Sequence, residues 1–276
     1  MVDSLGGYIG NEGFHILKDA WSQKEYLADH CNALVEHFDA GVRATECAVP
    51  APRQDYCLGR PVTEAINERS EERLLERAML KRWCESGMWP IPGGWSQLVG
   101  FQVPLYSSKS QEKWGAIDLL GVDRQGIPVV VELKRGPKPT TDGRTGGSET
   151  PLRMVLEAAS YAIAIRKNWP HFRNAWIDRL RAIGITEDVI SQIPTNLSGL
   201  PLVAAAPASF WIDWLPVTAK GRNKVGRNAW EAFASFLDQL SRSGFPTVFI
   251  SISGNEKDVS GLAIQPLDQF PQQLIG

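Results

Sequence analysis

Residues 114–135 read WGAIDLLGVDRQGIPVVVELKR, two apolar runs separated by a short polar segment. The polar segment from Asp123 to Gly126 is typical of a tight hairpin turn. The runs on either side of it predict strands at 114–122 and 127–135. Because both runs carry apolar residues on both strand faces, we expect the two strands near the centre of a sheet that is covered on both sides.

The sequence around this hairpin predicts the remaining elements of an α/β domain. Apolar periodicity and capping patterns predict helices at about 61–86, 151–167 and 228–242, and strands at 98–106, 200–206 and 247–253. Thr150 and Pro151 supply the N-cap and the first-turn proline of the helix at 151–167. This order, helix, three strands, helix, strand, helix, strand, indicates an α/β fold with a mixed central sheet flanked by helices.

Residues 1–60 are expected to form a small N-terminal helical extension without an assigned role, and residues 61–276 the main domain. Ser22 and Glu25 form a capping-box pattern, which predicts the start of a helix. We expect this helix to run to about Ala40 and Gly41 to end it.

Composition and charge limit the class of protein. The chain has 276 residues, 43% of them hydrophobic and 22% charged, which is ordinary for a globular protein. A net charge of −2 means that any nucleic acid must be bound by local basic patches. The apolar stretches are too short for a membrane span, no secretory signal is visible, and the four cysteines lack a C-x-x-C pair. We therefore expect a reduced, cytoplasmic protein with no membrane partner.

The hairpin brings two acidic residues face to face. A turn centred near residue 125 pairs residues whose numbers sum to about 250, so Leu120 lies opposite Val130 and Asp118 opposite Glu132. Side chains paired in this way have Cβ atoms about 4.5–5.5 Å apart, and Lys134 follows on the same face. Two buried like charges cost several kcal/mol unless a group of opposite charge compensates them. A divalent cation such as Mg²⁺, which prefers one or two carboxylates, would do so.

The helix at 61–86 carries a third acidic candidate. Its expected buried stripe consists of Leu74, Leu75, Ala78 and Met79. At about 100° per residue, Glu71 projects inside this stripe, whereas Glu72 and Glu76 lie at or beyond its edge. We expect Glu71 to face the core, with Glu72 as the reserve candidate.

These residues resemble the active-site motif of a known family. Asp118, thirteen intervening residues and then Glu132-Leu133-Lys134 resemble the motif of the PD-(D/E)XK nuclease superfamily, which has the restriction-endonuclease-like αβββαβ core. The resemblance covers about 190 residues, from the helix at 61–86 to the strand at 247–253. Ile117 stands where the family name has proline.

The resemblance implies a Mg²⁺-dependent nuclease, with Mn²⁺ as a substitute ion. Asp118 and Glu132, helped by Glu71 and by the backbone carbonyl of Leu133, would hold the metal. Lys134 would position the attacking water or stabilise negative charge on the phosphate. One branch of the superfamily has a glutamine followed four residues later by tyrosine on its second core helix. Glu157 and Tyr161 occupy these places here, as supporting residues in which glutamate replaces glutamine.

Basic residues near the motif and in a later loop are candidates for contacts with nucleic acid, DNA rather than RNA. They are Arg135, Lys138, Arg144, Lys220, Arg222, Lys224 and Arg227. Trp211 and Trp214 could stack on bases, although core packing is the commoner role of tryptophan.

Two readings other than an active enzyme remain open. The three charged motif residues could form an ordinary structural ion cluster. The chain could also be a non-catalytic nucleic-acid-binding or assembly module that keeps the nuclease fold. The sequence does not decide whether the chain forms a homodimer.

Overall fold

The fold is taken from a computed structural model that describes residues 13–15, 27–53, 55–56, 58, 71–84, 89–91, 94–105, 114–135, 150–211, 214, 227–268 and 270–271. Its helices are α3 (Leu27–Glu36), α4 (Phe38–Ala48), α5 (Glu71–Cys84), α6 (Pro151–Lys167), α7 (Trp169–Ala182), α8 (Glu187–Ile190), α9 (Ala208–Trp211) and α11 (Arg227–Arg242). Its strands are β1 (Trp89–Ile91), β2 (Gly94–Pro104), β3 (Ala116–Val122), β4 (Pro128–Leu133), β5 (Leu202–Pro207), β6 (Thr247–Asn255) and β7 (Asp258–Pro266).

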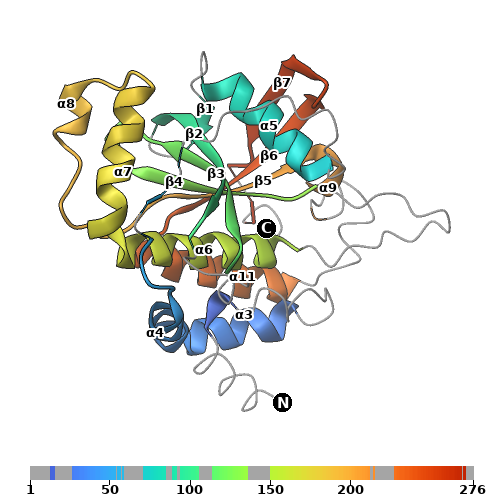
Figure 1. The fold of residues 1–276 in the computed structure, drawn as a ribbon. Coiled ribbons are helices and arrows are strands. Elements are labelled where there is room, and N and C mark those ends of the chain that lie inside the picture. The colour runs from blue at the N-terminus through green and yellow to red at the C-terminus, as the bar shows by residue number, and fades with distance from the viewer. Residues whose placement is uncertain are drawn as a thin grey trace.

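A mixed, seven-stranded sheet forms the centre of the molecule, with its strands in the order β1 to β7 (Figure 1). The strands β2, β3 and β4 are antiparallel neighbours, β4, β5 and β6 run parallel, and β7 returns antiparallel to β6. The sheet curls, because β1 and β7, the first and last strands of this order, contact each other. The parallel step from β4 to β5 requires a long crossover, and helices α6 to α8 provide it.

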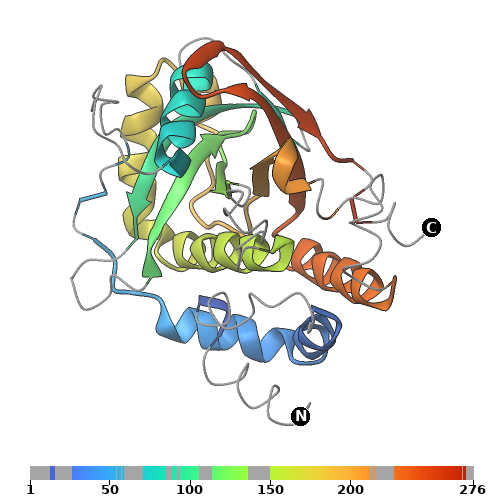
Figure 2. The ribbon, with the colours of Figure 1, turned by 90° about the vertical axis from the view of Figure 1, so that its right-hand side faces the viewer.

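Helices cover both faces of this sheet (Figures 1 and 2). One face packs against α6 and α11, and the other packs against α5. Helices α3 and α4 form an outer layer, since α3 packs on α11 and α4 on α6. The described residues before position 60 therefore belong to the same hydrophobic core as α6 and α11. Among the residues with described structure, each helix is too short or too polar to cross a bilayer.

The pairing of β3 with β4 confirms the predicted register. Leu120 pairs with Val130, and Val122 pairs with Pro128. Leu119 packs in the core on the α5 side, whereas Leu120 packs in the core on the α6 side, so both strands are buried on both faces as predicted. The paired residues end at Leu119 and Val131, one position before the predicted pair of Asp118 and Glu132.

The turn between β3 and β4 is built by its own side chain and by one glycine. The carboxylate of Asp123 accepts hydrogen bonds from the N–H groups of Gln125, at 2.9 Å, and Ile127, at 2.7 Å. Gly126 has φ of +79°, a left-handed conformation that favours glycine. The indole N–H of Trp176 on α7 donates to the Gly126 carbonyl at 2.8 Å, which ties the crossover helix to the hairpin.

The prediction for the N-terminal helix was wrong at its end. The expected stop at Gly41 is absent, because α3 ends at Glu36 and α4 runs through a buried Gly41 to Ala48. The hydroxyl of Thr45 donates to the Gly41 carbonyl at 2.7 Å and accepts from the N–H of Phe14 at 2.8 Å. Tertiary packing at this position overrides the weak tendency of glycine to end a helix. The predicted start of the helix, near Ser22, lies outside the described residues.

Candidate functional site

Five ionisable side chains are buried where β3 and β4 meet helices α5 and α6. The exposed fraction is 7% for Asp118 on β3, 2% for Glu132 on β4, and 7% for Lys134 just after β4. It is 0% for Glu76 on α5 and 5% for Glu157 on α6. Charged groups in a protein interior are costly unless they are paired or bind an ion. This cluster therefore needs a compensating arrangement.

In both β2 and β3, the regular alternation of side chains between the two faces of the sheet is interrupted at this place. Phe101 and Leu119 pack in the core on the α5 side, whereas Val103 and Ile117, two residues away, pack in the core on the α6 side. In a regular strand, residues two apart share a face. The residues between them therefore lie at the border of the two faces, and Asp118 can meet groups on both sides.

On the α5 side, three carboxylates surround one small space. One oxygen each of Glu72, Glu76 and Asp118 lies within 4.8 Å of the others. The amide Nε2 of Gln102 donates to Glu76 Oε2 at 2.9 Å and to Asp118 Oδ1 at 3.3 Å. Glu76 Oε1 is buried and has no hydrogen-bond partner among the residues that the structure describes. The group thus has three acidic oxygens in reach of one ion. Glu132, which was predicted to share the ion with Asp118, is not part of this group.

The burial of Glu76 corrects the predicted orientation of the helix. The stripe was expected to include Leu74, with Glu76 at or beyond its edge, but Leu74 is half-buried and Glu76 is fully buried. Leu80 and Trp83 are buried instead, so the core-facing stripe is rotated toward Glu76 and Glu72. Helix α5 packs on β7 as well as on β2 and β3, which widens its buried face. The side chain of Glu71, the predicted core-facing acid, lies outside the described side chains.

Burial raises the pKa of three of these acids, Glu76, Asp118 and Glu132. Desolvation, with repulsion from Asp118, raises the pKa of Glu76 from 4.5 to about 8. Desolvation raises the pKa of Asp118 from 3.8 to about 6, although Lys134 and the N–H of Leu133 act in the opposite direction. The pKa of Glu132 is raised well above its ordinary value by desolvation and by Asp118. The site as it stands favours protonated carboxyl groups, and a bound cation would favour the ionised form.

On the α6 side, Lys134 is held between two carboxylates. Its ammonium contacts Glu132 and lies 2.6 Å from Glu157 Oε2. Arg153, one turn before Glu157 on α6, lies 3.4 Å from the other oxygen of Glu157. Tyr161 is buried one turn later, and desolvation, with repulsion from Glu132 and Glu157, raises its pKa. Glutamate at position 157 therefore makes an ion pair with the motif lysine, which a glutamine could not make.

The start of α6 is built as the sequence predicts. The Thr150 hydroxyl accepts a hydrogen bond from the N–H of Arg153 at 3.1 Å, and Pro151 begins the helix. The cap fixes the first turn of α6, and Glu157 follows on its buried side.

The backbone at the end of β4 and just after it also contacts the acids. The N–H of Leu133 donates to Asp118 Oδ2 at 2.9 Å, and the N–H of Arg135 donates to Glu72 Oε2 at 3.4 Å. The guanidinium of Arg135 lies 3.2 Å from Glu256, in the turn between β6 and β7. Leu133 was predicted to contribute its carbonyl to a metal, and the contact observed here is made by its N–H.

Most of the predicted nucleic-acid contacts cannot be located. Lys138, Arg144, Lys220, Arg222 and Lys224 lie outside the described residues. Arg227, at the start of α11, is exposed and lies 2.9 Å from Glu231.

The two tryptophans considered for base stacking are core residues. Trp211 and Trp214 are buried, and the indole N–H of Trp211 is directed to the backbone carbonyls of Ala206 and Ile250. Their faces are therefore not available to stack on bases.

Sequence reasoning missed two residues of this site, Glu76 and Gln102. Gln102 could have been found by extending the pairing arithmetic to β2. Phe101 pairs with Leu119 and Val103 with Ile117, so Gln102 lies across from Asp118. A second use of the rule that identified Glu132 leads to Gln102, provided that the β2–β3 register is known.

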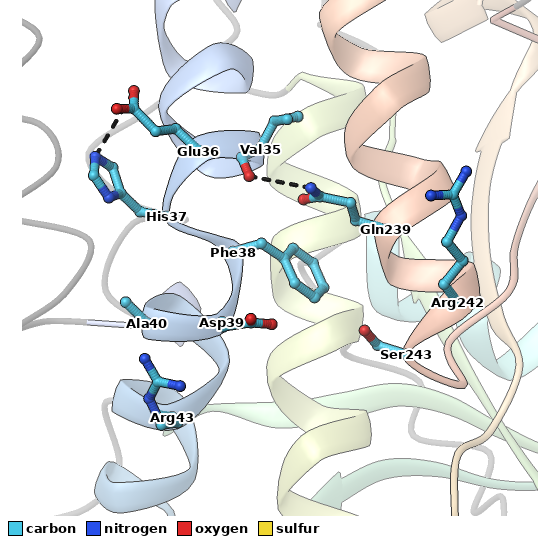
Figure 3. Close-up of a pocket in the computed structure, with 10 residues that line it drawn as sticks. All are labelled: Val35, Glu36, His37, Phe38, Asp39, Ala40, Arg43, Gln239, Arg242 and Ser243. Carbon is cyan, nitrogen blue, oxygen red and sulfur yellow. Dashed lines mark hydrogen bonds and ion pairs between the residues drawn. The ribbon is translucent and has the colours of Figure 1, made fainter.

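A surface pocket of about 540 Å³ lies elsewhere, between the α3–α4 junction and the end of α11 (Figure 3). Its charged lining residues are Glu36, His37, Asp39, Arg43 and Arg242. Both signs of charge are present, and Glu36 and His37 lie 3.9 Å apart. The lining contains none of the motif residues and does not favour one class of ligand.

Comparison of the chain with protein families, with curated proteins and with solved structures found no match. The buried charged residues themselves are therefore the guide to the function of this chain.

Proposed function

We propose that this chain is a Mg²⁺-dependent nuclease with a restriction-endonuclease-like fold, which hydrolyses phosphodiester bonds in DNA. The observation that carries the proposal is the group formed by half-buried Glu72 with buried Glu76 and Asp118, adjacent to the Glu132–Lys134 pair. The order α5, antiparallel β2–β3–β4, α6 and a β5 parallel to β4 supports the proposed fold.

The donor set fits a hard divalent cation. Mg²⁺ and Mn²⁺ bind carboxylate oxygens, and the three acidic oxygens lie close enough together to share one ion. Oε1 of buried Glu76 has no hydrogen-bond partner among the described residues, and a cation would satisfy this acceptor. Three ionised carboxylates in one buried space would repel each other without such an ion.

The residues of the chain have separate roles in the proposed reaction. Mg²⁺, when bound, would lower the pKa of a bound water and stabilise charge on the phosphate. Asp118 is oriented for this purpose by the N–H of Leu133. The ammonium of Lys134 is held in place by Glu132 and Glu157, and it offers positive charge where negative charge develops on the phosphate.

Compartment and substrate are part of the same proposal. The described cysteines, Cys31, Cys47 and Cys84, are free thiols, which fits a reducing cytoplasm. Arg135 lies directly after Lys134, so its guanidinium could exchange Glu256 for a phosphate of the DNA backbone.

A nuclease assay tests the proposal. Wild type, Asp118→Asn and Lys134→Ala are incubated with single-stranded, double-stranded and branched DNA and with RNA, in Mg²⁺, in Mn²⁺ and in EDTA. We expect cleavage of DNA by wild type only in the presence of metal, and a loss of at least about 100-fold in each variant. Asp188→Asn, which makes the same change at an exposed acid on α8, is the matched control and should cut like wild type. If folded wild-type protein cuts none of these substrates in either metal, the proposed nuclease activity is refuted.

A second function is favoured by one observation. Lys134 is already neutralised by Glu132 and Glu157, as in a structural ion cluster, which fits a non-catalytic nucleic-acid-binding or assembly module. Melting with and without Mn²⁺ separates the two functions. A nuclease metal site predicts a higher melting temperature in Mn²⁺ that Asp118→Asn abolishes, and the structural cluster predicts no response to Mn²⁺.

A further inference from the structure

Gln102 occupies the space between two of the three carboxylates. Its Nε2 donates to both Glu76 Oε2 and Asp118 Oδ1. A cation that binds these same two oxygens would lie where the hydrogen atoms of Nε2 now point. Since an N–H donor and a cation repel each other, the Gln102 amide must move or turn when the ion enters.

The backbone directs Gln102 to this position. Gln102 is the residue across from Asp118 in the β2–β3 pairing, and its φ of +47° is left-handed. For a residue other than glycine this conformation costs about 1–3 kcal/mol. At this residue β2 switches from the core on the α5 side to the core on the α6 side, so the side chain reaches α5 instead of following the regular alternation.

We propose that Gln102 is a ligand of the divalent cation, through its amide oxygen. A rotation of 180° about the Cγ–Cδ bond exchanges Oε1 and Nε2 without moving the rest of the side chain. The turned amide presents Oε1 to the space shared by Glu72, Glu76 and Asp118. Amide carbonyl oxygens are suitable ligands for Mg²⁺ and Mn²⁺, and a neutral fourth ligand adds no further charge to the three carboxylates.

The buried Oε1 of Glu76 gives independent support for an ion at this place. It is fully buried and has no hydrogen-bond partner among the described residues, while the other oxygen of the same carboxylate is bonded to Gln102. A donor that satisfied both oxygens would remove the need for an ion. Among the described residues, the hydrogen bond that Glu76 accepts comes from the Gln102 amide, so a cation that binds the Glu76 carboxylate would replace this bond and turn the amide.

This inference rests on the metal site of the proposed nuclease, and metal binding can be measured separately from cleavage. Titration calorimetry with Mn²⁺ and melting in a Mn²⁺ series are carried out on wild type, Gln102→Met and Gln102→Glu. Methionine keeps the length of the side chain and removes both polar groups. We expect Gln102→Met to weaken Mn²⁺ binding at least about tenfold, and Gln102→Glu to strengthen it by a similar factor. Gln97→Met makes the same change on β2 away from the acids and should bind Mn²⁺ like wild type.

The direction of the change in Mn²⁺ affinity shows whether Gln102 is a metal ligand or only keeps the two acids apart. If Gln102 only separates two acids as a hydrogen-bond donor, its removal frees the space, and Gln102→Met binds Mn²⁺ as tightly as wild type or more tightly; that result overturns the inference. Weaker Mn²⁺ binding by Gln102→Glu overturns it as well, and this variant remains informative if Gln102→Met does not fold. Wild type that binds Mn²⁺ but cuts no nucleic acid leaves the ligand role intact and refutes the nuclease. Wild type that binds no Mn²⁺ overturns both.

Discussion

Replacement of Glu76 by glutamine should remove a large pH dependence from the stability of the metal-free protein. Glu76 has a raised pKa of about 8, against an ordinary value of 4.5, because it is buried next to Asp118. In the folded protein its carboxyl group therefore stays protonated over a pH range in which the unfolded chain ionises. The stability that this group contributes is fully present below about pH 4.5 and is lost as the pH rises to about 8.

The size of the effect follows from the two pKa values. Each pKa unit corresponds to about 1.36 kcal/mol, and pH 7 lies 2.5 units above the ordinary value of 4.5, so Glu76 should lower the free energy of unfolding by about 3 kcal/mol between pH 4.5 and pH 7. Glutamine keeps the shape and the oxygen that accepts from Gln102, and it does not ionise. Asp118 and Glu132 also have raised pKa values, but both remain in the variant. The difference between wild type and variant thus isolates Glu76.

Urea unfolding in EDTA at pH 5, 6, 7 and 8 measures this difference. We expect Glu76→Gln to gain stability relative to wild type as the pH rises, by about 3 kcal/mol at pH 7. Glu231→Gln makes the same change at an exposed acid on α11 and should follow wild type at every pH. If the stabilities of Glu76→Gln and wild type change in parallel with pH, the pKa of Glu76 is not raised in the folded protein. Saturating Mg²⁺ should flatten the curve of wild type, because a bound cation favours the ionised carboxylate.

Three further substitutions test the framework of the site by urea unfolding. Gly126→Ala should destabilise by about 1–3 kcal/mol, because φ is +79° and an added Cβ would lie 2.9 Å from a neighbouring side chain. Thr150→Ala should cost about 1 kcal/mol, because the hydroxyl that caps α6 is lost. Lys134→Met should cost about 3–5 kcal/mol at pH 7, because Glu132 and Glu157 lose the ammonium between them. This last loss should shrink at pH 5, where carboxyl groups are protonated more easily.

The same urea-unfolding measurements can contradict each of these three expectations. An unchanged stability of Gly126→Ala would mean that the hairpin relaxes without strain. A full loss of structure in Thr150→Ala would mean that the cap does more than satisfy one N–H. A Lys134→Met protein that is equally destabilised at pH 5 and pH 7 would contradict the ionic origin of the loss.

The sequence predicted the central hairpin well, because its determinants are local. Asp123 and Gly126 set the turn, and the turn sets the pairing of the two strands as far as Leu119 and Val131. Helix α6 was predicted with its observed limits, since Thr150 and Pro151 define its first turn. These signals lie within a few residues of the structure that they produce.

The rest of the site depends on contacts that no local pattern contains. Glu76 is buried because α5 packs against three strands, among them β7, which the sequence prediction did not include. Gln102 reaches the acids only because its backbone is left-handed, a conformation that the sequence does not indicate for glutamine. The crossover helix α7 was also not predicted, although Trp176 anchors it to the hairpin turn.

The outer layer formed by α3 and α4 limits how much of the N-terminal part of the chain can be deleted. The rings of Phe14 and Phe38 lie 6.0 and 6.1 Å from the ring of Phe236 on α11, and all three are buried. A shortened version that starts at residue 61 would leave the α11 surface beneath α3 uncovered and bring Phe236 into water. Such a product should aggregate during expression, so removal of the first sixty residues is a poor way to obtain a shorter protein.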